Sequence, residues 1–151
     1  MRLLREKVLG PDAAAASHEH EQALRLAASA LFFEVVNADG EVTPEELAVM
    51  RTAVQSLFGL SREESEELAR LGESRSRSAA SIFEFTRLVD QGFPADQKKR
   101  VVELLWLIAF ADGRKDPEEE HVVRKIAGLL HVPHPDFIDA KLRARSESGL
   151  E

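Results

Sequence analysis

A short acidic motif occurs twice in the sequence, with a constant offset between corresponding residues. The two copies read Ala38-Asp39-Gly40 with Thr43-Pro44-Glu45-Glu46, and Ala111-Asp112-Gly113 with Asp116-Pro117-Glu118-Glu119. Apolar residues precede each copy, at 31–36 and at 104–109. Each copy therefore predicts an apolar helix, a tight acidic turn and an amphipathic helix. We expect a twofold internal repeat with copies at about 23–60 and 96–133.

The remaining pattern predicts an all-α fold, because no stretch shows the strict alternation of a half-buried strand. We expect about seven or eight helices in a single domain over residues 1–151, since 44% of the 151 residues are hydrophobic. The helices expected at 17–37 and 94–111 are apolar on most sides and should form the central pair.

Two segments should lie outside this helical core. Residues 1–11 carry charges that interrupt the apolar run of a signal peptide, and Gly10-Pro11 predicts the end of a short separate helix. Residues 72–78, Gly-Glu-Ser-Arg-Ser-Arg-Ser, are polar and of low complexity, and they predict a mobile linker between the two copies.

The charge distribution argues against one class of partner and for another. A net charge of −7 disfavours nucleic acid, whose phosphates select basic surfaces. Residues 39–69 hold eight acidic residues against two arginines, whereas residues 70–100 hold seven basic residues against four acidic ones. This asymmetry favours docking to a protein partner by charge complementarity, and a solvated surface without a partner is the alternative.

Composition also bears on the compartment. No apolar run approaches the roughly 20 residues that cross a bilayer, so we expect no transmembrane segment. The absence of cysteine fits a reducing compartment and predicts a cytoplasmic protein.

Helix capping explains much of the acidic motif. Thr43 and Asp116 are placed as N-cap residues, each followed by a proline at the first helical position. Glu46 and Glu119 are placed three residues later, where a glutamate completes a capping box.

Asp39 and Asp112 are different, because each lies at the negative end of a helix dipole. An Asx-turn is one compensation and a bound cation is another. With Gly40 at position six of an EF-hand loop, Asp39 and Glu46 fall at ligand positions five and twelve, but position one is Val35, which excludes a complete EF-hand. The candidate metal ligands are Asp39, Glu46, Asp112 and Glu119, and the candidate ions are calcium, magnesium and manganese.

The doubled Ala-Asp-Gly, each with a glutamate seven residues after its aspartate, resembles the tellurite-resistance TerB family, which includes the N-terminal region of DjlA-type co-chaperones. The resemblance implies an all-helical, cytoplasmic, non-catalytic interaction or sensing module of stress-response systems. It also implies divalent metal binding and work in complexes at the inner face of the membrane. The alternatives are a metal-assisted hydrolase that uses the same carboxylates, and a purely structural protein-binding domain.

Overall fold

The computed structural model describes the backbone of residues 2–113 and 116–149 and the side chains of residues 15–113 and 116–149. Within these ranges the chain forms seven α-helices and no strand. They are α1 (Arg2–Val36), α2 (Pro44–Phe58), α3 (Arg62–Ser78), α4 (Phe83–Gly92), α5 (Ala95–Ala109), α6 (Pro117–Leu129) and α7 (His134–Glu147). The predicted all-α class is therefore confirmed.

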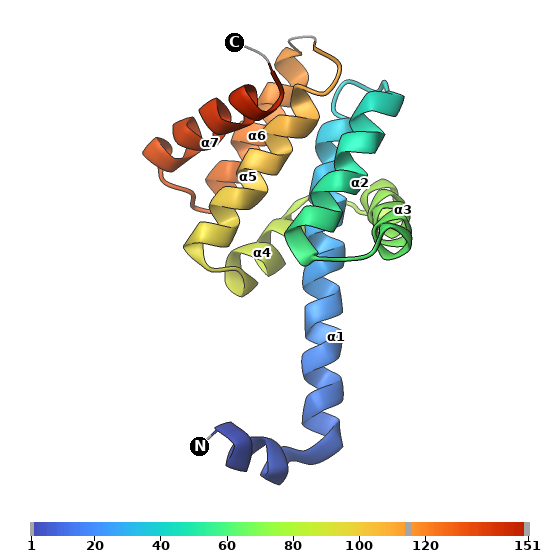
Figure 1. Cartoon of the computed structure of the whole chain (residues 1–151), viewed down its shortest axis with the longest axis vertical. Coiled ribbons are helices and arrows are strands. Elements are labelled where there is room, and N and C mark those ends of the chain that lie inside the picture. The colour runs from blue at the N-terminus through green and yellow to red at the C-terminus, as the bar shows by residue number, and fades with distance from the viewer. Residues whose placement is uncertain (1, 114–115, 150–151) are drawn as a thin grey trace.

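Helices α1 and α5 lie at the centre of the molecule, as their apolar sequences predict (Figure 1). α1 packs against α2, α3, α4, α5 and α6, and α5 also packs against α2, α6 and α7. The C-terminal part of α1 and most of α5 are buried, with Phe32, Phe33 and Trp106 among the largest side chains of the core. α3 covers α1 on one side and α7 covers α5 on the other. The internal repeat, with copies at about 23–60 and 96–133, stays a prediction.

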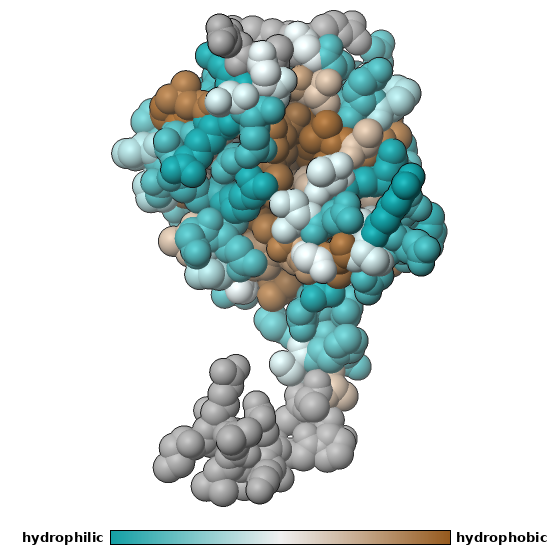
Figure 2. Space-filling model, in the orientation of Figure 1, coloured by the Kyte–Doolittle hydropathy of each residue, from teal (hydrophilic) through white to brown (hydrophobic). Residues whose placement is uncertain are grey.

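The surface of the described residues is largely hydrophilic (Figure 2). On the face shown, hydrophobic residues are visible along the middle, between the half that contains α5 and α7 and the half that contains α2. The hydrophobic side chains that are partly buried against the core include Leu47 of α2 and Leu107 of α5.

The predicted end of a helix at Gly10-Pro11 is wrong, because α1 continues from Arg2 to Val36. The helix expected at 17–37 is the C-terminal part of this longer helix. Figure 1 shows a sharp bend in the N-terminal part of α1.

The predicted mobile linker is also wrong, because residues 72–78 form the last turns of α3. Gly72 lies directly against Ser29 of α1, so close that a Cβ atom there would be 2.1 Å from the Ser29 hydroxyl oxygen. Ser76 donates a short hydrogen bond to the Glu34 carboxylate, and the Arg77 guanidinium lies 5.0 Å from the ring centre of Phe33. These contacts with α1 outweigh the weak helix propensity of glycine and serine.

Candidate metal centre

The two acidic turns meet in the folded chain. One carboxylate oxygen each from Asp39, Asp116 and Glu119 lies within 4.8 Å of the others. Asp39 belongs to the turn between α1 and α2, whereas Asp116 and Glu119 belong to the turn between α5 and α6 and to the start of α6. Figure 1 shows both turns at the same end of the molecule. The packing of α1, α5 and α6 therefore brings together two motifs that are far apart in the sequence.

The first turn has the structure that its sequence predicts. Gly40 has a φ of +81°, in the left-handed region that favours glycine. The Asp39 carboxylate accepts a hydrogen bond of 2.9 Å from the backbone N–H of Glu41, which forms an Asx-turn. Thr43 caps α2 and accepts from the Glu46 N–H, while Glu46 Oε1 accepts from the Thr43 N–H and hydroxyl. The predicted capping box is thus confirmed for this copy.

The second turn uses a carboxylate as its cap. Asp116 Oδ1 accepts hydrogen bonds from the backbone N–H groups of Glu118 and Glu119, at 2.8 and 3.3 Å. The predicted N-cap role of Asp116 is confirmed. Because Asp116 occupies the position that Thr43 holds in the first copy, the second copy adds a carboxyl group to the site.

Glu46 and Glu119 form a buried carboxyl pair. Both residues are only 1% exposed. Burial, together with a hydrogen bond to Glu46 and the nearby negative charges, raises the pKa of Glu119 to about 10. Since Thr43 donates two hydrogen bonds to Glu46, Glu46 is the acceptor of the pair and Glu119 holds the proton.

The second carboxyl oxygen of each glutamate also shows that the pair needs a proton or a cation. Glu46 Oε2 and Glu119 Oε2 are buried and have no hydrogen-bond donor among the described residues. An ionised carboxylate oxygen can only accept a hydrogen bond. Two neighbouring carboxyl groups with such buried oxygens are therefore stable only with a proton or a cation between the groups.

Asp39 and Asp116 form a second carboxyl pair, closer to the surface. The hydrogen bond between their side chains is the main cause that raises the pKa of Asp39. The N–H of Glu41 lowers the pKa of Asp39 and partly opposes this effect. Each pair joins one residue from the first turn to one from the second, so the four carboxyl groups bridge the two halves of the chain.

This arrangement suits a hard divalent cation. Calcium binds carboxylate oxygens at about 2.3–2.6 Å, so ligands on one ion lie up to about 5 Å apart. The three clustered oxygens meet this requirement. Of the predicted ligands, Asp39 and Glu119 are in the cluster and Glu46 pairs with Glu119, whereas Asp112 is not one of the three clustered residues. Asp116 was predicted only as an N-cap, and a carboxylate at the position that Thr43 holds in the first copy is the signal that could have identified it as a ligand.

Comparison with known proteins identifies the family. The family described as "Tellurite resistance protein TerB" matches residues 25–142, which include both acidic turns and α2 to α6 in full. The chain belongs to the TerB family. No curated protein matches this TerB-family chain.

A solved structure shares the fold. It is a protein of unknown function from Porphyromonas gingivalis W83, with 24% identity and a TM-score of 0.60 over 82% of this TerB-family chain and 95% of that protein. In the described part of the chain, none of the helices has the length and apolar character needed to span a membrane.

Proposed function

We propose that this TerB-family protein is a non-catalytic interaction or sensing module that binds one divalent cation between its two acidic turns. The proposed ligands are Asp39, Glu46, Asp116 and Glu119, and Asp112 stays a predicted ligand from the same turn. The observation that carries the proposal is the buried pair of Glu46 and Glu119, whose Oε2 atoms lack a hydrogen-bond donor among the described residues. A cation at this position would replace the proton of Glu119 and compensate both carboxylates at once.

Three of these carboxylates also stabilise the turn or the helix start to which they belong, which supports a binding role over a catalytic one. Asp116 caps α6, Glu46 closes the capping box of α2, and Asp39 forms the Asx-turn. These bonds hold the three carboxylates in place. A cation would therefore tie the start of α2 to the start of α6.

By connecting the starts of α2 and α6, the ion would control the surface that the two halves of the chain present to a protein partner. In a stress-response system, the partner would be a component of a cytoplasmic complex at the inner face of the membrane. The uneven charge of residues 39–69 and 70–100 supports association through charge complementarity.

Calorimetry and thermal unfolding with calcium, magnesium and manganese test the proposal. A ligand that binds only the folded state raises the melting temperature by mass action. We expect this rise in the wild type and not in Asp39→Asn/Asp116→Asn. The asparagine at 116 keeps a good N-cap, so the variant should fold.

Glu45→Gln/Glu118→Gln is the matched control. Glu45 and Glu118 are exposed residues in the first turns of α2 and α6, and the control removes the same number of charges. It should keep the metal response of the wild type. No binding heat and no thermal shift of the wild type with any of the three ions would overturn the metal proposal.

A further inference from the structure

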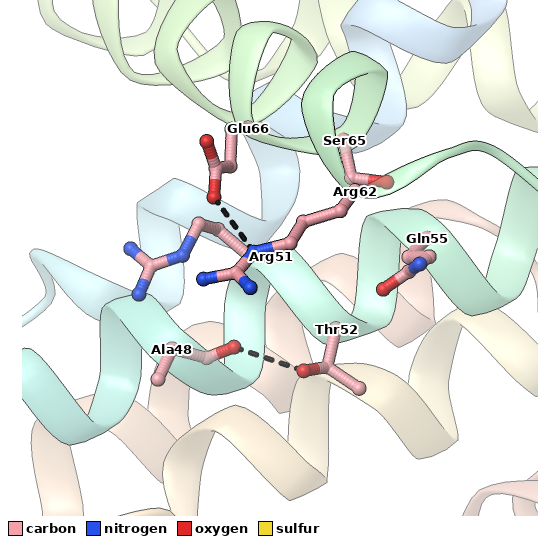
Figure 3. Close-up of a pocket in the computed structure, with 7 residues that line it drawn as sticks. All are labelled: Ala48, Arg51, Thr52, Gln55, Arg62, Ser65 and Glu66. Atoms are coloured by element: carbon pink, nitrogen blue, oxygen red, sulfur yellow. Dashed lines mark hydrogen bonds and ion pairs between the residues drawn. The ribbon is translucent and has the colours of Figure 1, made fainter.

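The solvent-facing side of α2 and the start of α3 form a polar pocket that is separate from the acidic turns (Figure 3). Its volume is about 530 Å³. The lining residues of α2 are at positions 48, 51, 52 and 55, which share one face of the helix, and those of α3 are at 62, 65 and 66. The opposite face of α2 is buried through Met50, Ala53 and Val54. The pocket therefore lies outside the core and shares no lining residue with the carboxyl pairs.

Two arginines give this pocket a charge unlike its surroundings. Arg51 and Arg62 are the only basic residues of the stretch 39–69, which holds eight acidic residues. Both line the pocket, although they belong to different helices. Figure 3 shows their side chains extending into the space between α2 and α3. Folding thus brings the two basic residues of an otherwise acidic segment into the same pocket.

Hydrogen-bond donors in the pocket remain available. Arg62 Nε donates to Glu66 Oε1 at 3.3 Å, which leaves its terminal nitrogens uncommitted in that ion pair. Arg51 and the side-chain amide of Gln55 make no hydrogen bond or ion pair within the part of the chain that the structure describes. Paired guanidinium groups with a nearby amide match the oxygens of a phosphate group.

Hydrogen-bond acceptors line the rest of the pocket. The Thr52 hydroxyl donates to the Ala48 carbonyl at 3.1 Å, and the Ser65 hydroxyl donates to the Ser61 carbonyl at 2.7 Å. Since the Thr52 hydroxyl has used its hydrogen, its oxygen can only accept from a ligand. Ser65 is only 2% exposed, so its hydroxyl shapes the wall of the pocket and does not reach a ligand. Glu66 adds carboxylate oxygens. Such acceptors suit the hydroxyl groups of a ligand and not a second anionic group.

We propose that this pocket binds a small phosphorylated polyol or sugar. Arg51, Arg62 and Gln55 would hold the phosphate, while Thr52 and Glu66 would accept hydrogen bonds from the ligand's hydroxyl groups. The volume lies within the range of about 300–1,000 Å³ that is usual for small-molecule sites. This assignment is independent of the proposed cation site, because no residue is shared between the two.

The corresponding place in the second copy of the motif lacks this chemistry. When the copies are aligned at Asp39 and Asp112, Arg124 corresponds to Arg51 and Gly128 corresponds to Gln55. The Arg124 guanidinium lies 5.3 Å from the ring centre of Phe137 and packs on that ring. The first copy alone therefore combines an uncommitted arginine with the amide.

Binding is measured by NMR titration and calorimetry with ribose 5-phosphate, inorganic phosphate and ribose, in buffer freed of divalent cations. Ribose 5-phosphate should shift the backbone amides of 48–55 and 62–66 and saturate. Arg51→Ala/Arg62→Ala should weaken its binding at least about tenfold, because both charge-assisted contacts to the phosphate are lost. Arg70→Ala/Arg87→Ala removes the same charge at exposed sites outside the pocket and should change affinity less than about twofold.

Thr52→Val tests the hydroxyl contact separately. It should weaken ribose 5-phosphate but leave inorganic phosphate unaffected. The proposal is overturned by the absence of localised, saturable shifts, or by equal losses in the two double-arginine variants. Equal affinity for inorganic phosphate and ribose 5-phosphate would refute the polyol part. Because no metal is present, none of these results depends on the cation site.

Discussion

Glu46 and Glu119 belong to different copies of the acidic motif, and their carboxyl groups lie together in the protein interior. Each comes from the first turn of a helix, α2 or α6, and each is almost completely buried. Buried carboxyl groups usually lie against a basic partner, because an ionised carboxylate is costly to remove from water. Here the neighbours of Glu119 are three other carboxyl groups, Glu46, Asp116 and Asp39. The pair therefore makes stability sensitive to protons and cations.

The first prediction concerns the pH dependence of the metal-free protein. The pKa of Glu119 rises from 4.5 to about 10 on folding. Between these values the folded protein keeps a proton that the unfolded chain releases. Stability from this group is therefore complete below pH 4.5 and falls as pH rises, by at most about 1.4 kcal/mol per pH unit.

Glu119→Gln should remove this slope, because glutamine stays neutral and can still donate to Glu46. In urea unfolding from about pH 5.5 to 8.5, the free energy of unfolding of the variant should increase relative to that of the wild type as pH rises. Glu118→Gln, at the exposed neighbouring position, should keep the wild-type slope. Parallel curves for Glu119→Gln and the wild type would contradict the buried-proton assignment.

The second prediction compares two glycines inside helices. At Gly72 an added Cβ would lie 2.8 Å from the backbone carbon of Ser29, so α3 would have to move away from α1. Gly72→Ala should destabilise the protein by about 1–3 kcal/mol. Gly128 has nothing within 4 Å of such a Cβ, and Gly128→Ala should stabilise α6 by about 0.5–1 kcal/mol. Chemical denaturation that gives the same sign for both would rule out the close contact.

The third prediction isolates the cap of α2. Thr43→Ala removes the side-chain acceptor of the Glu46 N–H and one donor to Glu46 Oε1. Its loss should cost about 0.5–2 kcal/mol of unfolding free energy. Thr52→Ala, on the exposed side of the same helix, is the control and should be neutral or slightly stabilising. Equal effects of the two changes would show that the capping box contributes nothing.

The fourth prediction concerns His131, a non-glycine residue with a φ of +60° just after α6. Its Nδ1 lies 3.0 Å from an Asp90 oxygen, and both His131→Gly and His131→Ala remove that contact. The difference between the two variants therefore measures the backbone alone. Glycine should be the more stable by about 1 kcal/mol. Identical melting temperatures would show that the left-handed conformation costs nothing here.

The sequence predicted the parts of the structure that local chemistry determines. Thr43 with Glu46 formed the expected capping box, and Asp116 took the expected N-cap position of α6. The apolar runs identified the two central helices, since a helix surrounded by others needs apolar residues on most sides. These features depend on residues within about one or two helical turns of each other.

The predictions from the sequence were wrong or incomplete where contacts between distant residues determine the structure. Residues 72–78 have a linker's composition, yet packing against Ser29, Phe33 and Glu34 holds them in a helix. The inclusion of Asp116 in the acidic cluster depends on how α5 and α6 pack against α1, which no local pattern encodes. Likewise, only the fold places Arg51 and Arg62 in the same pocket.

The carboxyl pairs also bear on folding kinetics. About half of the chain separates Asp39 from Asp116, and nearly as much separates Glu46 from Glu119, so both contacts close very long loops. Contacts of such separation tend to form late, after the apolar helices have collapsed. Repulsion between the turns is then absent from the transition state and acts mainly on the native state. An ion bound there would leave the folding rate nearly unchanged and slow the rate of unfolding.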